Sequence, residues 1–68
     1  MSKDRERIKT KPLYRIGQQI YLKSNPFELE TIRRIVTDLR GAHWYYTTMS
    51  DGVQRKCGIP EDFIRRAH

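Results

Sequence analysis

The chain lacks the features that would staple a small protein internally or anchor it in a membrane. Cys57 is the single cysteine among 68 residues, so no disulfide can form within the chain. Cys57, His43 and His68 are too few and too scattered for a structural zinc site, which takes four ligands at paired spacings. No apolar run approaches the roughly 20 residues that cross a bilayer, and the N-terminus has no secretory signal pattern. These absences predict a cytoplasmic protein without membrane contact, metal or other cofactor.

The chain is also short of the groups that catalysis needs. A length of 68 residues permits one small domain and no deep substrate cleft. No glycine-rich phosphate loop is present. A Cys–His pair could form a thiol nucleophile, but no third group is spaced to orient His43, and Cys57 is expected at a core position. Glu61 and Asp62 follow Pro60 at the expected start of a helical turn, where carboxylates interact favourably with the free backbone amides. They are therefore interpreted as a cap and not as a general acid and base. We therefore expect no enzyme activity.

Positive charge is what the chain has in excess, with 14 Lys and Arg against 8 Asp and Glu and a net charge of +6. Residues 1–12 are predicted to form a basic, flexible arm before a domain over residues 13–68, because they carry no core-forming pattern. Further basic pairs follow at Arg33-Arg34, Arg55-Lys56 and Arg65-Arg66. Such pairs are typical of solvated strand faces and equally of anion-binding surfaces.

The hydrophobic pattern of the first half predicts short strands. Ile20 and Leu22 alternate with polar residues, and Asn25-Pro26 is expected to stop this first strand. Residues 28–41 hold a β-branched run that favours a second strand. Their apolar positions also fit one face of a helix, so that alternative stays open.

The second half predicts a hairpin followed by one helical turn. The segments 43–49 and 53–59 flank Ser50-Asp51-Gly52, a strong turn signal. Pro60 is expected to begin a single helical turn, and residues 64–68 are expected to form the last short strand.

Four stretches resemble small SH3-like barrels of the Tudor and KOW type: "YRIGQQIYLK", "ETIRRI", "WYYTTMSDG" and "IPEDFIRR". The resemblance covers about residues 13–66. It implies an all-β fold, a single five-stranded antiparallel barrel with a one-turn helix before the last strand. It says little about function, because barrels of this kind bind DNA, RNA and proteins alike. Glu30 stands where those barrels usually have a glycine, so the first loop is expected to differ in shape.

The register of the hairpin decides what the aromatic residues do, because a slip of one residue exchanges its two faces. With a three-residue loop, Met49 pairs with Val53 and Tyr45 with Cys57. Tyr45, Val53, Cys57 and Ile59 then face the core, and Trp44 and Tyr46 stand on the outer face. With a two-residue Asp51-Gly52 turn, Trp44 and Tyr46 line the core instead. We expect the first register.

These expectations point to a non-catalytic binding module. Its partner is expected to be nucleic acid, with basic residues on the phosphates and the two rings stacking on bases. The alternative is a docking module, or a small subunit of a larger complex, that binds an acidic protein. The chain is expected to be a monomer or a weak homodimer. The predicted partner-binding residues are Arg33, Arg34, Trp44, Tyr46 and Lys56.

Overall fold

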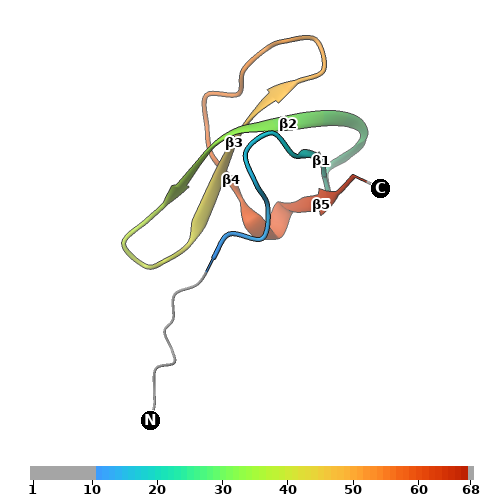
Figure 1. Ribbon diagram of the computed structural model, residues 1–68. Coiled ribbons are helices and arrows are strands. Elements are labelled where there is room, and N and C mark those ends of the chain that lie inside the picture. Colours follow the sequence, from blue (N-terminus) through green and yellow to red (C-terminus); the bar gives the residue numbers. More distant parts are fainter. Residues whose placement is uncertain (1–10, 68) are drawn as a thin grey trace.

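The computed structural model describes residues 11–67 and shows a small, curved β-sheet (Figure 1). Its elements are β1 (Gln19–Leu22), β2 (Asn25–Thr37), β3 (His43–Met49), β4 (Ile59–Pro60), a 3-10 turn η2 (Glu61–Phe63) and β5 (Ile64–Arg66). The predicted basic arm, residues 1–12, lies outside the described residues apart from Lys11 and Pro12.

All strand pairings are antiparallel, in the order β4-β3-β2-β1-β5. The long strand β2 joins the two halves of the sheet, because Glu30 and Thr31 pair with β1 on one side and with β3 on the other. β4 and β5 stand at opposite ends of this order and do not pair with each other, so the sheet is open. The all-β prediction with five antiparallel strands is confirmed, whereas closure into a barrel is not seen.

The first turn differs from its prediction. Asn25-Pro26 was expected to stop the first strand, but that strand already ends at Leu22 and Asn25 is the first residue of β2. Leu22 pairs directly with Asn25, so Lys23 and Ser24 make the whole turn. The segment that also fitted one face of a helix is a strand, β2. Its β-branched residues favour this form, and both neighbouring strands pair with it.

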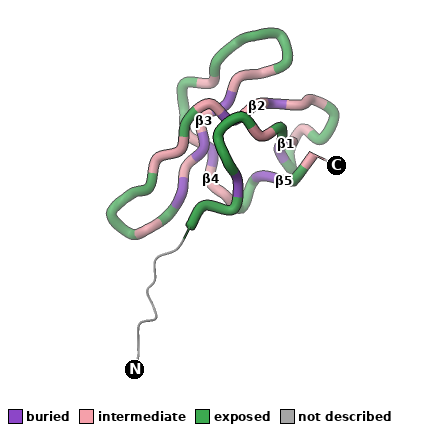
Figure 2. Tube along the Cα trace, in the orientation of Figure 1, coloured by how far each residue is buried: buried purple, intermediate pink, exposed green. Residues whose placement is uncertain are grey.

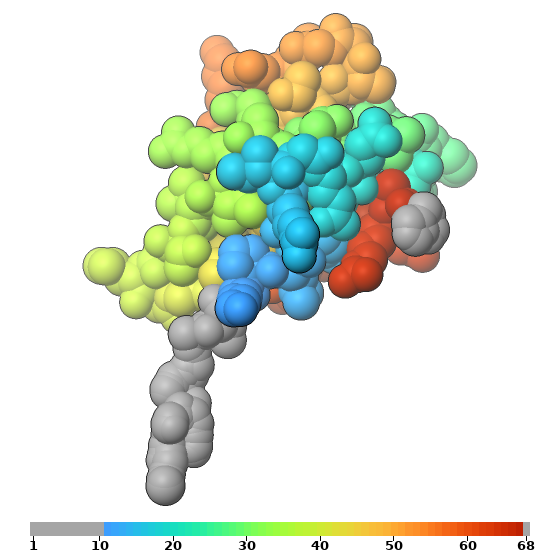
Figure 3. All heavy atoms as spheres, viewed as in Figure 1, coloured from blue at the N-terminus to red at the C-terminus, as the bar shows by residue number. Residues whose placement is uncertain are grey.

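The hydrophobic core consists of aliphatic side chains and two tyrosines. Figure 2 shows where the buried residues lie along the chain. Tyr45 is fully buried, and the ring of Tyr14 meets it edge to face, with 5.4 Å between the ring centroids. Tyr14 comes from the segment before β1, which Gly17 and Gln18 tie to Ile32 through backbone hydrogen bonds. Figure 3 shows this segment, in blue to cyan, lying across β2, in green. The core is completed by Ile20, Leu22, Ile32, Ile59 and Ile64.

The hairpin after β3 begins in the expected register. Ser50-Asp51-Gly52 forms a three-residue loop with Gly52 in the left-handed region at φ 92°, and the Met49 amide donates to the Val53 carbonyl at 2.7 Å. Thr48 then bridges Gln54, and the Arg55 amide donates to the Thr47 carbonyl. Tyr45 faces the core, so Trp44 and Tyr46 are on the outer face, as predicted.

Beyond Arg55 the predicted pairing is wrong. Tyr45 pairs with Ile59 instead of Cys57. Lys56, Cys57 and Gly58 leave the sheet between Arg55 and Ile59, and this excursion shifts the pairing with β3 by two residues. Cys57 is therefore exposed, where the sequence placed it in the core, and Val53 is exposed as well. The predicted fourth strand over residues 53–59 is reduced to Ile59–Pro60 and the bridge at Gln54. Because the register shifts by two residues, and side chains alternate faces along a strand, Ile59 stays on the core face.

Candidate nucleic-acid interface

A bulge in β2 brings Arg33 and Arg34 to the same side of the sheet. Ile32 pairs with Thr47 and Arg34 pairs with Tyr46, so Arg33 is the extra residue. In a regular strand these two side chains would point to opposite faces. Here the guanidinium carbons of Arg33 and Arg34 lie 5.7 Å and 5.5 Å from the centre of the Tyr46 ring. Both distances are within the range of cation–π attraction.

The two arginines differ in how strongly they are held. The Nη2 atom of Arg33 donates to the Arg55 carbonyl at 2.7 Å, and its buried Nε has no hydrogen-bond partner in the described structure. Arg33 is thus half-buried and fixed between Tyr46 and the excursion. Arg34 is exposed, and no described carboxylate pairs with it. Arg34 is therefore the more available cation for an anionic partner.

Trp44 and Tyr46 lie on the outer face but are only half exposed. A Cβ added at Gly58 would stand 3.1 Å from Trp44 Cβ and 3.2 Å from Tyr46 Cε1 and Cζ, so the excursion packs closely over both residues. The Trp44 Nε1–H donates to Asp38 at 3.1 Å. That bond and two backbone amides lower the pKa of Asp38. The rings are supports within the face and offer little open area for stacking.

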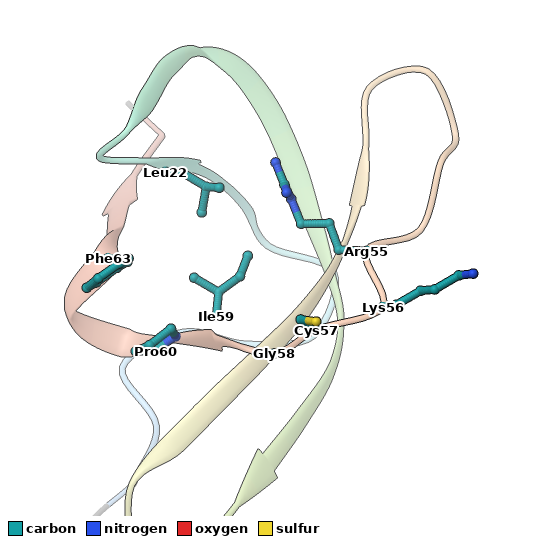
Figure 4. A pocket seen from close by; sticks show the side chains of 8 residues that line it. All are labelled: Leu22, Arg55, Lys56, Cys57, Gly58, Ile59, Pro60 and Phe63. Carbon is teal, nitrogen blue, oxygen red and sulfur yellow. The ribbon is translucent and has the colours of Figure 1, made fainter.

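Lys56 is the first residue of the excursion. Its side chain is exposed and points away from the sheet, whereas the side chain of Arg55 turns inward (Figure 4). Lys56 is two residues from Gly58, which contacts Tyr46. The structure therefore groups Arg33, Arg34 and Tyr46 by direct contact. Trp44 precedes Tyr45 on the same strand and shares the outer face with Tyr46, whereas Lys56 is connected to this group only through the excursion that ends at Gly58.

Glu30, which the sequence singled out only as a missing glycine, forms the strongest polar cluster in the described structure. Its carboxylate is 1% exposed and accepts hydrogen bonds from Thr47 Oγ1 at 2.6 Å and from Nε and Nη2 of Arg55 at 2.7 and 2.8 Å. The Arg55 guanidinium, more than any other group, lowers the pKa of Glu30. The available signal was a charged residue two positions before Ile32, which puts Glu30 on the core-facing side of the strand.

Glu61 also does more than complete a helix start. Its Oε2 accepts a hydrogen bond from the Tyr45 hydroxyl at 2.5 Å and another from the Leu13 amide at 3.1 Å. Burial, together with this hydrogen bond, raises the pKa of Tyr45. Glu61 thus joins the η2 turn to β3 and to the segment before β1.

An apolar hollow has the excursion Lys56–Gly58 as one of its walls (Figure 4). It encloses about 360 Å³ between Leu22, Ile59, Pro60 and Phe63, with Arg55 at one end. Phe63 is 59% exposed there. The hollow is open and contains no described carboxylate in its lining.

Residues 11–67 contain few further groups that could carry chemistry. No group of three or more His, Cys, Asp and Glu side chains in this range could hold a metal ion. His43 is buried and its Nδ1 lies 2.8 Å from Thr37 Oγ1, while Cys57 is exposed. None of the helices in the same range is long and apolar enough to cross a membrane.

Comparisons of the chain with protein-family models, with curated proteins and with solved structures gave no match.

Proposed function

We propose that this protein binds nucleic acid through the outer face of β2 and β3, with Arg34 and Lys56 contacting phosphates. The observation that carries the proposal is the pair of guanidinium groups that a strand bulge gathers on Tyr46. No described carboxylate neutralises Arg34 or Lys56. Cations that are held close together without an acidic partner attract a polyanion.

The half-buried rings argue for contact with phosphates rather than bases. Tyr46 is covered by Arg33, Arg34 and Gly58, so its role is to hold the arginines. Phosphate contacts carry no sequence information by themselves. Binding is therefore expected to vary little with sequence and to weaken steeply with salt.

A salt titration tests this proposal with three ligands of equal length, a single-stranded DNA, a duplex DNA and a single-stranded RNA. Arg34→Ala and Lys56→Ala should each weaken binding and reduce the slope of log affinity against log salt by about 1. Lys23→Ala is the matched control, since Lys23 is an exposed cation in the β1–β2 turn. An equal effect of Lys23→Ala would mean that binding is spread over the whole charge, and the proposed interface would be wrong.

The hollow beside Phe63 favours a second candidate, docking of an acidic protein partner. In that case a basic, exposed surface would steer the partner and the apolar hollow would take one of its side chains. Phe63→Ala would then abolish binding to the partner while leaving oligonucleotide affinity unchanged. Loss of oligonucleotide binding in Phe63→Ala would speak against two separate surfaces.

We infer an SH3-like barrel, in which η2 carries the chain from β4 at one end of the sheet to β5 at the other. The strand order and the position of this turn support it. An experimental structure with β4 and β5 far apart across a flat sheet would contradict it.

A further inference from the structure

Glu30 is a buried carboxylate that the proposed function does not use. It lies on the core face of β2, while Arg34 and Tyr46 are on the outer face. Burying a charge costs free energy unless the charge is paired and hydrogen-bonded. Glu30 meets that condition through Thr47 and the two bonds from Arg55. A bidentate pair of this kind fixes the direction of the Arg55 side chain as well as its distance.

Arg55 is also the residue at which the hairpin pairing breaks. Its amide donates to the Thr47 carbonyl at 2.9 Å, and the next residue paired with β3 is Ile59. Figure 4 shows Arg55 directed inward at the start of this excursion and Lys56 directed outward. The bonds to Glu30 therefore hold the point from which Lys56 projects.

The main chain of Arg55 transmits this restraint to the outer face. Its carbonyl accepts a hydrogen bond from Arg33 Nη2 at 2.7 Å. The same Arg33 guanidinium lies over the Tyr46 ring, against which Gly58 packs at the far end of the excursion. Both ends of the excursion are thus linked to Tyr46, one through Arg33 and the other through Gly58. The first end is held by the Glu30 carboxylate, which lies on the other side of the sheet.

We propose that Glu30 is a positioning residue for the outer face: through Arg55 it orients Arg33 against Tyr46 and sets where Lys56 projects. This inference rests on the proposed nucleic-acid binding. For the affinity of Glu30→Gln, a positioning role predicts a change opposite to the one that net charge predicts. Glu30→Gln removes a negative charge, so electrostatics alone predicts tighter binding of a polyanion, whereas loss of positioning predicts weaker binding.

The experiment measures oligonucleotide affinity for wild type, Glu30→Gln and the control Asp62→Asn. Asp62 is exposed, so its variant makes the same change in charge without touching Arg55. Glu30→Gln should weaken binding by about threefold to tenfold, the size of coupling found between residues in contact. Asp62→Asn should bind as well as wild type or slightly better. Binding by folded Glu30→Gln that equals or exceeds that of Asp62→Asn would overturn the inference.

Two further measurements guard against trivial outcomes. Arg55→Lys keeps the charge but loses the two-pronged bond to Glu30, so it should weaken binding even if Glu30→Gln fails to fold. In an Arg33→Ala background, Glu30→Gln should cause a smaller loss than in wild type, because the part that acts through Arg33 is already gone and only the effect on Lys56 remains. A fully additive loss would contradict the route through Arg33.

The inference can also be judged apart from binding. The NMR signals of the Arg33 Nε–H group and the Tyr46 ring should shift in Glu30→Gln and stay unchanged in Asp62→Asn. If wild type binds no oligonucleotide, the proposed function fails, and these signals still decide whether Glu30 orients Arg33. Unchanged signals in both variants would refute the positioning role.

Discussion

Tyr45 connects three parts of the molecule through a single side chain. Its ring is fully buried against Tyr14, and its hydroxyl donates to Glu61 on the η2 turn. Burial raises the pKa of this hydroxyl, so it remains a donor throughout the physiological pH range. The same carboxylate also binds the Leu13 amide, so Tyr45 helps to hold the chain entering the domain.

Replacing Tyr45 with Phe should separate the hydrogen bond from the packing. Tyr45→Phe keeps the ring but removes the donor to Glu61, and it should lower the free energy of unfolding by about 1 kcal/mol. Urea denaturation measures this change. Tyr21→Phe is the control, since Tyr21 is half-buried and its hydroxyl has no hydrogen bond among the described residues. Equal stability losses in the two variants would show that the Glu61 contact contributes nothing specific.

Glu30 should make the stability of the domain depend on acid pH. Because the fold lowers the pKa of Glu30 below 4.5, its ionised form stabilises the folded state above that pH. This contribution is lost as the pH falls through the folded pKa. Glu30→Gln should therefore be less stable than wild type by about 1–3 kcal/mol at pH 7, and the difference should shrink below pH 4.5. Thermal unfolding at several pH values measures it, and a difference that is constant down to pH 2 would contradict the assignment.

At the scale of elements, the strands could be predicted from the sequence but their irregularities could not. Ile32 is buried and Ile35 packs against the core although the two are three positions apart in a strand, and the bulge at Arg33 is what makes this possible. The three-residue loop Ser50-Asp51-Gly52 is the register expected from the sequence, although Asp51-Gly52 by itself fits a two-residue turn equally well. The excursion at Lys56–Gly58 could not be predicted, because its position depends on a contact between Glu30 and Arg55, which are distant in sequence.

The excursion itself can be tested at Gly58. An added methyl group at this position would come within 3.1 Å of Trp44 Cβ, an atom that the strand holds in place. Gly58→Ala should therefore destabilise the domain by about 1–3 kcal/mol through overpacking, and it should shift the Tyr46 ring signals in NMR spectra. Gln54→Ala, at an exposed position of the same hairpin, should change stability by less than about 0.5 kcal/mol. A neutral or stabilising Gly58→Ala would mean that the excursion does not pack on the rings.

The same hairpin gives a second contrast between the expected and the observed register. Val53 is 55% exposed although its predicted place was the core, whereas Ile59 is buried. Val53→Thr should therefore change stability by less than about 0.5 kcal/mol, while Ile59→Ala should cost about 2–5 kcal/mol. Urea denaturation of both variants checks this, and a large loss in Val53→Thr would favour the pairing expected from the sequence.

At the scale of the whole molecule, the sequence indicated the charge and the faces but not the contacts that organise them. Trp44 and Tyr46 were expected on the outer face, and the structure places them there together with Arg33 and Arg34. The stacking role expected for the rings stays a prediction, and their partial burial disfavours it. Asp38 and Glu30, which restrain Trp44 and Arg55, were not recognised because each acts through a hydrogen bond that periodicity does not reveal.

The basic arm should add to binding as a sequence-independent source of charge. Residues 1–10 carry Lys3, Arg5, Arg7 and Lys9 against Asp4 and Glu6, so removing them lowers the net charge by 4 − 2 = 2. Deletion should weaken binding to DNA and RNA alike and reduce the salt slope by about 2 to 3, because released counterions follow the number of phosphate contacts. Replacing all six charged residues of this segment with Gln in the full chain lowers the net charge by the same 2 and should reproduce the deletion, which separates the charge of the arm from its length. An unchanged slope in both variants would confine binding to the outer face of β2 and β3.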